Sequence, residues 1–393
     1  MKKVFTNFFI MTLILTNLSF ADINSVQAAT TNKTIKVSLE NIKDIIIENS
    51  SEIKIQHNNI QIKKEYYNNA KDIKDKNESA KDEAENKLKN LMGDSNATKE
   101  QIKYAEDALE AAKKEVKNDN DALVQARKAY KDAKTVYDQK VETEVDEAQK
   151  AYIDYLSNIS NTTLEENAVK SSEEKEKLAK FKYESGFLSN KDYISVTQDN
   201  SDSINKLKEL RDTEELSKIK LCNMLGISSK ENITFSTDIN SDFQAISQIN
   251  YEDDLKKMLS NNIQIGNQND EIDDLKDKED DYEDNDQDDI YDYEVKNANI
   301  ELKKLIGDSE IKFKEQYSTL INSYNAIKNS YSKILQEQKE YNIIEAKYDY
   351  GFVSKTELEN SKSSFDKDNA SFTNEKNKLY IEYLHYIQMR EGY

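Results

Sequence analysis

Lys182-Tyr183-Glu184-Ser185-Gly186-Phe187-Leu188-Ser189 occurs a second time, slightly altered, as Lys347-Tyr348-Asp349-Tyr350-Gly351-Phe352-Val353-Ser354. Five of the eight positions are identical, and the Glu/Asp and Leu/Val differences keep the chemical type. A glycine adopts positive φ readily and can end a helix, and a serine three positions later can cap the next helix. Each copy therefore predicts a tight corner between two helices.

Helical patterns flank both corners. Asp192 and Glu357 each follow the corner serine by three positions, which is close to a capping box. Beyond the second corner, apolar residues return at a strict seven-residue step, which makes helices supercoil around partners. These residues are Leu358, Phe365, Phe372, Leu379 and Tyr386. We therefore predict an all-α fold of two tandem repeats of long antiparallel helical hairpins with coiled-coil packing, and at most short strands near the repeat junction.

The composition favours long helices over an enzyme. Of the 393 residues, 34% are charged and only seven are Gly, while Pro and Trp are absent. A net charge of −20 disfavours binding to nucleic acid. His57 and His385 have no ligand partner at a suitable spacing, and Cys222 lies on an apolar face as a small buried hydrophobe. We predict no catalytic residues, no metal site and no cofactor.

The first 28 residues have the pattern of a secretory signal peptide. Lys2 and Lys3 precede an apolar run, and Val26-Gln27-Ala28 places small residues at the −3 and −1 positions of a cleavage site. We therefore expect residues 1–28 to be removed and the remainder to be exported.

The remaining chain divides at a loop-rich stretch. We expect the first helical repeat to span residues 29–226 and the second to span 251–393. Between them, residues 227–250 form a linker in which Ile233-Thr234-Phe235 alternates like a short strand.

Two places in the first repeat could reverse the chain. Gly93-Asp94-Ser95-Asn96 breaks a helical pattern, and Thr98 with Gln101 then offers a capping box. Asn118-Asp119-Asn120-Asp121 is the second candidate, and it divides the first hairpin into nearly equal arms. We favour reversal at 118–121, with the Gly93 region as a kink or small loop. In the second repeat, Gly307-Asp308-Ser309 is equidistant from Ile263 and Gly351, which predicts equal arms there too.

The segment Asp270–Glu294 is strongly acidic, with fifteen Asp or Glu against two Lys. Asp284, Asp286 and Asp288 resemble the start of a Ca²⁺ loop, but the required Gly at position six is replaced by Asp289. We interpret the segment as solvated or self-repelling, with weak, low-specificity cation binding as the alternative.

These features together resemble the TolC family of outer-membrane efflux proteins. Four stretches carry the resemblance: Val37-Ser38-Leu39-Glu40, Glu48 to Ile53, the two corners, and Leu221 to Gly226. The resemblance implies a homotrimer whose helical arms form a hollow tube, an α-barrel. It also implies an adaptor protein and an ABC-type or other inner-membrane exporter as partners, with the corners at the adaptor contact. The implied contact residues are Lys182, Tyr183, Gly186, Ser189, Lys347, Tyr348, Gly351 and Ser354.

The sequence departs from this family at the far end of the hairpins. Family members carry membrane-spanning strand pairs there, which need about 9–11 alternating residues each. Nothing near 93–98, 118–121 or 284–309 has that pattern. We expect an exported duct component of the cell envelope, in the outer membrane if the source has one and otherwise at the cell surface. The alternative is a cell-surface coiled-coil spacer or adhesin without a transport role.

Overall fold

The computed structural model describes residues 34–237, 239, 243–281 and 288–393, which are mostly helical. The predicted all-α fold of long antiparallel hairpins is confirmed. The predicted signal peptide lies outside the described residues. The helices are α1 (Ile42–Asn49), α2 (Ser51–Gly93), α3 (Lys99–Glu184), α4 (Asn190–Met224), α5 (Gln244–Ser247), α6 (Tyr251–Asn261), α7 (Ile263–Asp281), α8 (Asp288–Asp349) and α9 (Lys355–Arg390). The strands are β1 (Ile35–Val37) and β2 (Ile233–Phe235).

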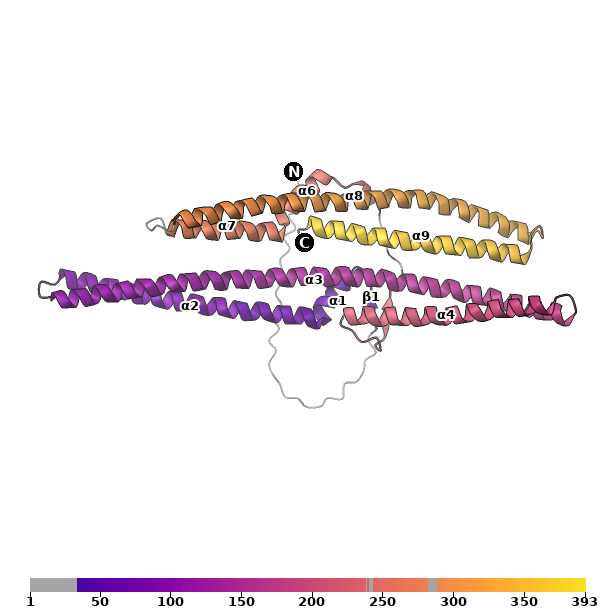
Figure 1. Cartoon of the computed structure of the whole chain (residues 1–393), viewed down its shortest axis with the longest axis horizontal. Coiled ribbons are helices and arrows are strands. Elements are labelled where there is room, and N and C mark those ends of the chain that lie inside the picture. Colours follow the sequence, from indigo (N-terminus) through magenta and orange to yellow (C-terminus); the bar gives the residue numbers. More distant parts are fainter. Residues whose placement is uncertain (1–33, 238, 240–242, 282–287) are drawn as a thin grey trace, which may run out of the picture.

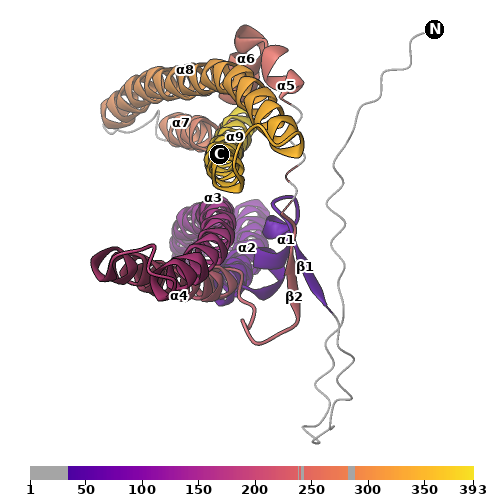
Figure 2. The same ribbon diagram turned by 90° about the vertical axis from the view of Figure 1, so that its right-hand side faces the viewer.

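Each repeat consists of one long helix covered by two shorter ones. The 86-residue α3 packs along the 43-residue α2 over its first part and along the 35-residue α4 over its second part. The 62-residue α8 is covered in the same way by α7 and α9 (Figure 1). Contacts between α3 and α9 join the two repeats. The helices form a wall in which α2 and α4 lie on one side of α3, α7 and α9 lie on its other side, and α8 follows beyond α7 and α9 (Figure 2). Within the described residues, no helix combines the length and apolar character needed to cross a membrane.

The first reversal lies at 94–98, so the predicted reversal at 118–121 is wrong. Thr98 caps α3 through a capping box with Gln101, as its spacing predicted. Residues 118–121 lie inside α3, where Asp119 accepts a hydrogen bond from Asn77 of α2 at 2.7 Å. Equal arms were the wrong criterion, because α3 is shared between two partners and extends far beyond the end of either one.

Equal arms are also wrong for the second repeat. Gly307 lies inside the continuous helix α8, and no atom lies within 4 Å of the position that a Cβ would occupy there. A single glycine costs a helix only about 1 kcal/mol, which the packing of a long helix offsets. The chain instead reverses between α7 and α8 (Figure 1).

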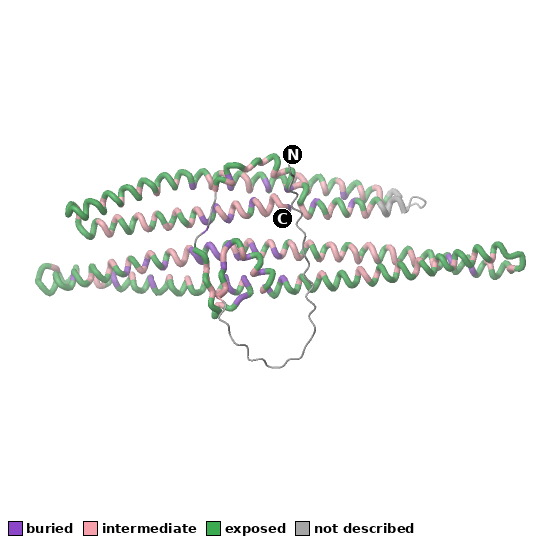
Figure 3. The backbone as a smooth tube through the Cα atoms, turned by 180° about the vertical axis from the view of Figure 1, so that it is seen from behind, coloured by how far each residue is buried: buried purple, intermediate pink, exposed green. Residues whose placement is uncertain are grey.

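The core lies at the middle of the molecule, where the short elements meet (Figure 3). β1 and β2 pair in parallel, with Val37 opposite Phe235. The fully buried Tyr152 of α3 places its hydroxyl 3.0 Å from the carbonyl oxygen of Val37 and 2.6 Å from that of Ser236. Burial raises the pKa of Tyr152 to about 12. The two-stranded sheet is therefore anchored to the long helix from one side.

Three residues at the start of the acidic segment stay partly exposed, but they are paired with basic side chains and so are not simply self-repelling. Their carboxylates lie against basic side chains of α3, which brings opposite charges together across the repeats. The ion pairs are Asp270–Lys131, Glu271–Lys128 and Asp274–Arg127. Residues 282–287 lie outside the described part of the chain.

In each repeat, a glycine just after the last helix packs against the point where one helix ends and the next begins. Gly226 has φ +67°, and a Cβ built on it would lie 2.7 Å from the carbonyl carbon and oxygen of Asn49, where α1 gives way to α2. Gly392 has φ +100°, and its Cβ would overlap the carbonyl group of Asn261, where α6 gives way to α7. The two repeats therefore share one construction. In the first repeat the backbone after α4 packs on the start of α2, and in the second repeat the backbone after α9 packs on the start of α7.

We predict that Gly226→Ala lowers the free energy of unfolding by about 1–3 kcal/mol, because the new methyl group meets rigid backbone at a positive φ. Urea unfolding followed by circular dichroism measures the change. The control is Gly307→Ala, which has open space in a helix and should stabilise the protein by up to about 1 kcal/mol. A Gly226→Ala protein as stable as its parent would contradict the close-packed junction.

Candidate functional site

The first corner ends α3 in a Schellman motif. Gly186 has φ +76°. The backbone N–H of Phe187 donates to the carbonyl of Lys182 at 2.7 Å, and the N–H of Gly186 donates to the carbonyl of Tyr183 at 3.0 Å. These two bonds satisfy carbonyls that a helix end otherwise leaves unpaired.

The second corner has the same geometry. Gly351 has φ +75°. The N–H groups of Phe352 and Gly351 donate to the carbonyls of Lys347 and Tyr348, both at 2.8 Å. The repeated sequence thus folds into a repeated local structure, and the predicted positive φ of both glycines is confirmed.

A serine cap begins the next helix at each corner. The N–H of Asp192 donates to Ser189 Oγ at 3.2 Å, and the Ser189 hydroxyl donates to the Asp192 carboxylate at 2.7 Å. At the second corner, the N–H of Glu357 donates to Ser354 Oγ at 3.2 Å. The predicted caps are present, and each corner is fixed on both sides by local hydrogen bonds.

The corner tips present aromatic rings to solvent. Phe187, Tyr350 and Phe352 are 82%, 80% and 79% exposed. Tyr183, by contrast, stacks on Tyr193 with ring centroids 5.0 Å apart, so it stiffens the corner from within. Both phenylalanines stand within the repeated phrase, but they were not among the predicted contact residues. The presence of Phe at the same position in both copies was the sequence signal that could have identified them as site residues.

The two corners lie at the same end of the molecule (Figure 1), and an ion pair connects their hairpins. Lys355 Nζ, in the first turn of α9, lies 2.6 Å from Glu174 Oε2 of α3. This hydrogen bond and the charge of Lys355 hold the pKa of the Glu174 carboxyl below its ordinary value. The same bond raises the pKa of Lys355. Neither residue was predicted, because nothing in the sequence places α9 beside α3.

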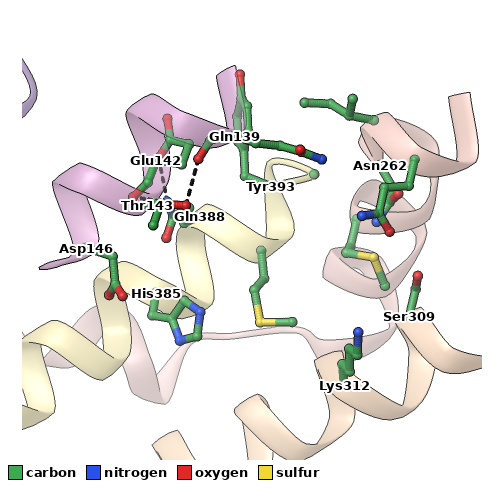
Figure 4. Close-up of a pocket in the computed structure, with 15 residues that line it drawn as sticks. Gln139, Glu142, Thr143, Asp146, Asn262, Ser309, Lys312, His385, Gln388 and Tyr393 are labelled. Atoms are coloured by element: carbon green, nitrogen blue, oxygen red, sulfur yellow. Dashed lines mark hydrogen bonds between the residues drawn. The ribbon is translucent and has the colours of Figure 1, made fainter. Parts of the chain in front are cut away.

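A cavity of about 510 Å³ lies far from the corners, between the repeats (Figure 4). His385 lines it, and at one side of it Gln388 donates to the Glu142 carboxylate at 2.5 Å. In the described part of the chain, no group of three or more His, Cys, Asp or Glu is arranged to hold a metal ion. Cys222 is fully buried, as its apolar neighbours predicted.

Comparison with known proteins gives a likeness of fold. No family model and no curated protein matches the sequence. Among solved structures, the Campylobacter jejuni CmeC outer membrane channel has a TM-score of 0.54 at 10% identity, with 96% of this chain and 94% of that chain covered. CusC, whose structures concern transmembrane channel formation, has a TM-score of 0.52 at 8% identity over 90% of this chain and 95% of its own. A membrane protein from Pseudomonas aeruginosa has a TM-score of 0.52 at 10% identity, over 90% and 92%.

The chain therefore has the fold of the TolC-type outer-membrane channels, and the resemblance found in the sequence is confirmed at the level of the fold. Two of these similar structures, CmeC and CusC, are described as channels. The contact role of the eight corner residues stays a prediction.

We predict that Lys355→Gln raises the pKa of the Glu174 carboxyl toward its ordinary value, because the depressed pKa depends on the Lys355 ammonium. In the parent, the ion pair is present above the ordinary Glu pKa and is lost as pH falls through the lowered value. Carbon-13 NMR of labelled glutamate carboxyls measures the titration. Lys191→Gln is the matched control and should leave the titration of Glu174 in place, whereas an unchanged titration in Lys355→Gln would exclude the contact in solution.

Proposed function

We propose that the chain is one subunit of a TolC-like efflux or secretion duct in the cell envelope. Three copies enclose a tube, and the tube works with an adaptor protein and an inner-membrane exporter that supplies the energy. The duct conducts its cargo and performs no chemistry. The observation that carries this proposal is the pair of matching corners at one end, each with aromatic rings in solvent.

Exposed rings on rigid corners suit a docking surface. Burying a Phe side chain contributes roughly 1.5–3 kcal/mol, and binding energy concentrates on a few aromatic anchors. The Schellman bonds and serine caps fix the corner backbone before a partner arrives, which lowers the entropic cost of binding. Three copies would present six such corners around the rim of one tube. A spacer or adhesin has no need for identical aromatic tips at one end.

We predict that Phe187→Ala with Phe352→Ala weakens binding of the cognate adaptor at least tenfold while leaving helicity and assembly unchanged. Both rings are about four-fifths exposed, so their removal costs the fold little. The duct proposal predicts that an adaptor is encoded beside the gene; this adaptor serves as the probe, and binding is measured by biolayer interferometry. Gly186→Val with Gly351→Val should act in the same direction, by straining the turns at positive φ.

Tyr104→Ala is the matched control, because this ring is 72% exposed but lies near the opposite end of α3. It should bind adaptor like the parent. If both double variants also bind like the parent, the corners are turns only and the duct proposal loses its main support.

A further inference from the structure

The part of the second repeat that lies opposite its corner is anchored less firmly than the rest. This part, the far arm, consists of α7 and of α8 as far as Lys312, and it lies along the first part of α3 (Figure 1). Among the described residues, none of α7 and none of α8 before Phe313 belongs to either hydrophobic core cluster. By contrast, Ile381 of α9 is part of the core of the first repeat. Core packing therefore anchors α9 to the first repeat, but it does not anchor the far arm.

The apolar face of α7 is directed to its own hairpin partner. Gln268 of α7 donates a hydrogen bond to a backbone carbonyl of α8 at 3.4 Å. The buried Ile265 and Ile272 lie three and four residues from Gln268, and this spacing places them on the same side of the helix. The apolar contacts of α7 are therefore made with α8, and a different face of α7 is left for α3.

Charged and polar side chains hold that other face of α7 on α3. The bonds follow one another in antiparallel order along the two helices: Arg127–Asp274, Lys128–Glu271 and Lys131–Asp270 are ion pairs, and Asn267 donates to Thr135 at 3.1 Å. The hydrogen bond to Glu271 raises the pKa of Lys128. All six charged side chains are between 23% and 56% exposed. Exposed ion pairs are individually weak, and salt screens them.

Two polar cavities lie between the far arm and α3. One of about 360 Å³ lies beside the ion pairs and is bordered by Asp132 of α3 and Leu305 of α8. The other, of about 510 Å³, lies at the start of the arm (Figure 4). Gln264 lines both cavities. Protein interiors are normally close-packed, so a contact interrupted by two cavities has few van der Waals contacts to lose when it opens.

Glycines mark the level at which the far arm can bend. Gly307 lies inside α8 and Gly266 lies near the start of α7, and no neighbouring segment comes within 4 Å of a Cβ placed on either glycine. Gly307 is followed by Ser309, and helices kink where glycine and serine occur together. Ser309 and Asn262, just before α7, line the same cavity, so both bending points lie at one level of the molecule.

We propose that the three ion pairs form a salt-sensitive latch. At low ionic strength they hold the far arm on α3. At high ionic strength the far arm swings away from α3, with Gly307 and the start of α7 as its pivot. The latch belongs to a single chain, so the inference does not rest on the proposed duct. In an assembled duct, opening of the latch would change the wall at the end opposite the corners.

Spin labels on the two sides of the latch test the proposal. Gln125→Cys places a label on α3 and Asn297→Cys places one on α8, and both native side chains are exposed. The native Cys222 is fully buried and stays in place. The label on α8 lies about 15 Å along the helix from Gly307, so a kink of about 20° moves it by roughly 5 Å.

Double electron–electron resonance measures the distance between the two labels, and labelled chains are diluted with unlabelled ones so that distances between copies do not contribute. The distance should lengthen by roughly 5 Å or more from about 0.01 M to about 1 M NaCl, because the screening length falls from about 30 Å to about 3 Å over that range. A distance that does not respond to salt would overturn the proposal.

Charge reversal on α3 should open the latch without added salt. Lys128→Glu with Lys131→Glu should give the long distance already at low ionic strength. Adding Asp270→Lys and Glu271→Lys to this variant should restore the short distance, because the pairs are then rebuilt with their signs exchanged. If the exchanged variant does not close, these ion pairs are not what holds the arm.

The matched control is Lys113→Glu with Lys114→Glu, which makes the same change of charge on exposed residues nearer the start of α3. It should keep the parent distance at low ionic strength, and an open control would show that net charge rather than the latch sets the distance. Gly307→Ala tests the pivot, since alanine favours a straight helix. It should reduce the salt-induced change, whereas a change as large as that of the parent would exclude Gly307 as the pivot.

Discussion

The structure depends on one constraint: a continuous helix of 86 residues has to be covered by partners that each extend along only part of it. α2 and α4 therefore meet near the middle of α3. There the ends of α1 and α4 and the start of α2 have to pack close together. The core gathers at this point, around Tyr152 and the two short strands, because exposed backbone ends there need cover. Because Gly226 has no side chain, the backbone after α4 packs directly on the backbone between α1 and α2. Gly392 allows the same contact between the backbone after α9 and the junction of α6 and α7. The outer arms, far from this junction, hold together mainly through helix pairs.

Local signals in the sequence predicted local structure well. The positive φ of Gly186 and Gly351, the caps at Ser189 and Ser354, and the short strand at Ile233–Phe235 all follow from the chemistry of a few neighbouring residues. The chain reversals were harder to predict. Equal arm lengths assume that a hairpin pairs only with itself, but α3 and α8 each serve two partners. The capping box at Thr98 was the better evidence, because it satisfies backbone donors that every helix start exposes.

The candidate site was predicted only in part, for a related reason. The repeated phrase located both corners, and Phe187 and Phe352 stood within it. How far each side chain is exposed depends on packing, however: Tyr183 stacks on Tyr193 and is 39% exposed, while the phenylalanines are about 80% exposed. The bond between Lys355 and Glu174 joins residues far apart in the chain, and no pattern of spacing reveals it. Likewise, part of the negative charge of the acidic segment is neutralised by basic residues of α3, and no local pattern in the sequence marked those residues as its partners.

The central claim is that this chain is part of a wall that encloses a space only when copies join. Cryo-electron microscopy of the purified mature chain tests that claim most directly. The account predicts end views with three-fold symmetry, a ring of helices around an empty centre, and all corners at one end of the particle. A filled bundle, or a pair of copies with their hairpins pointing in opposite directions, would contradict it.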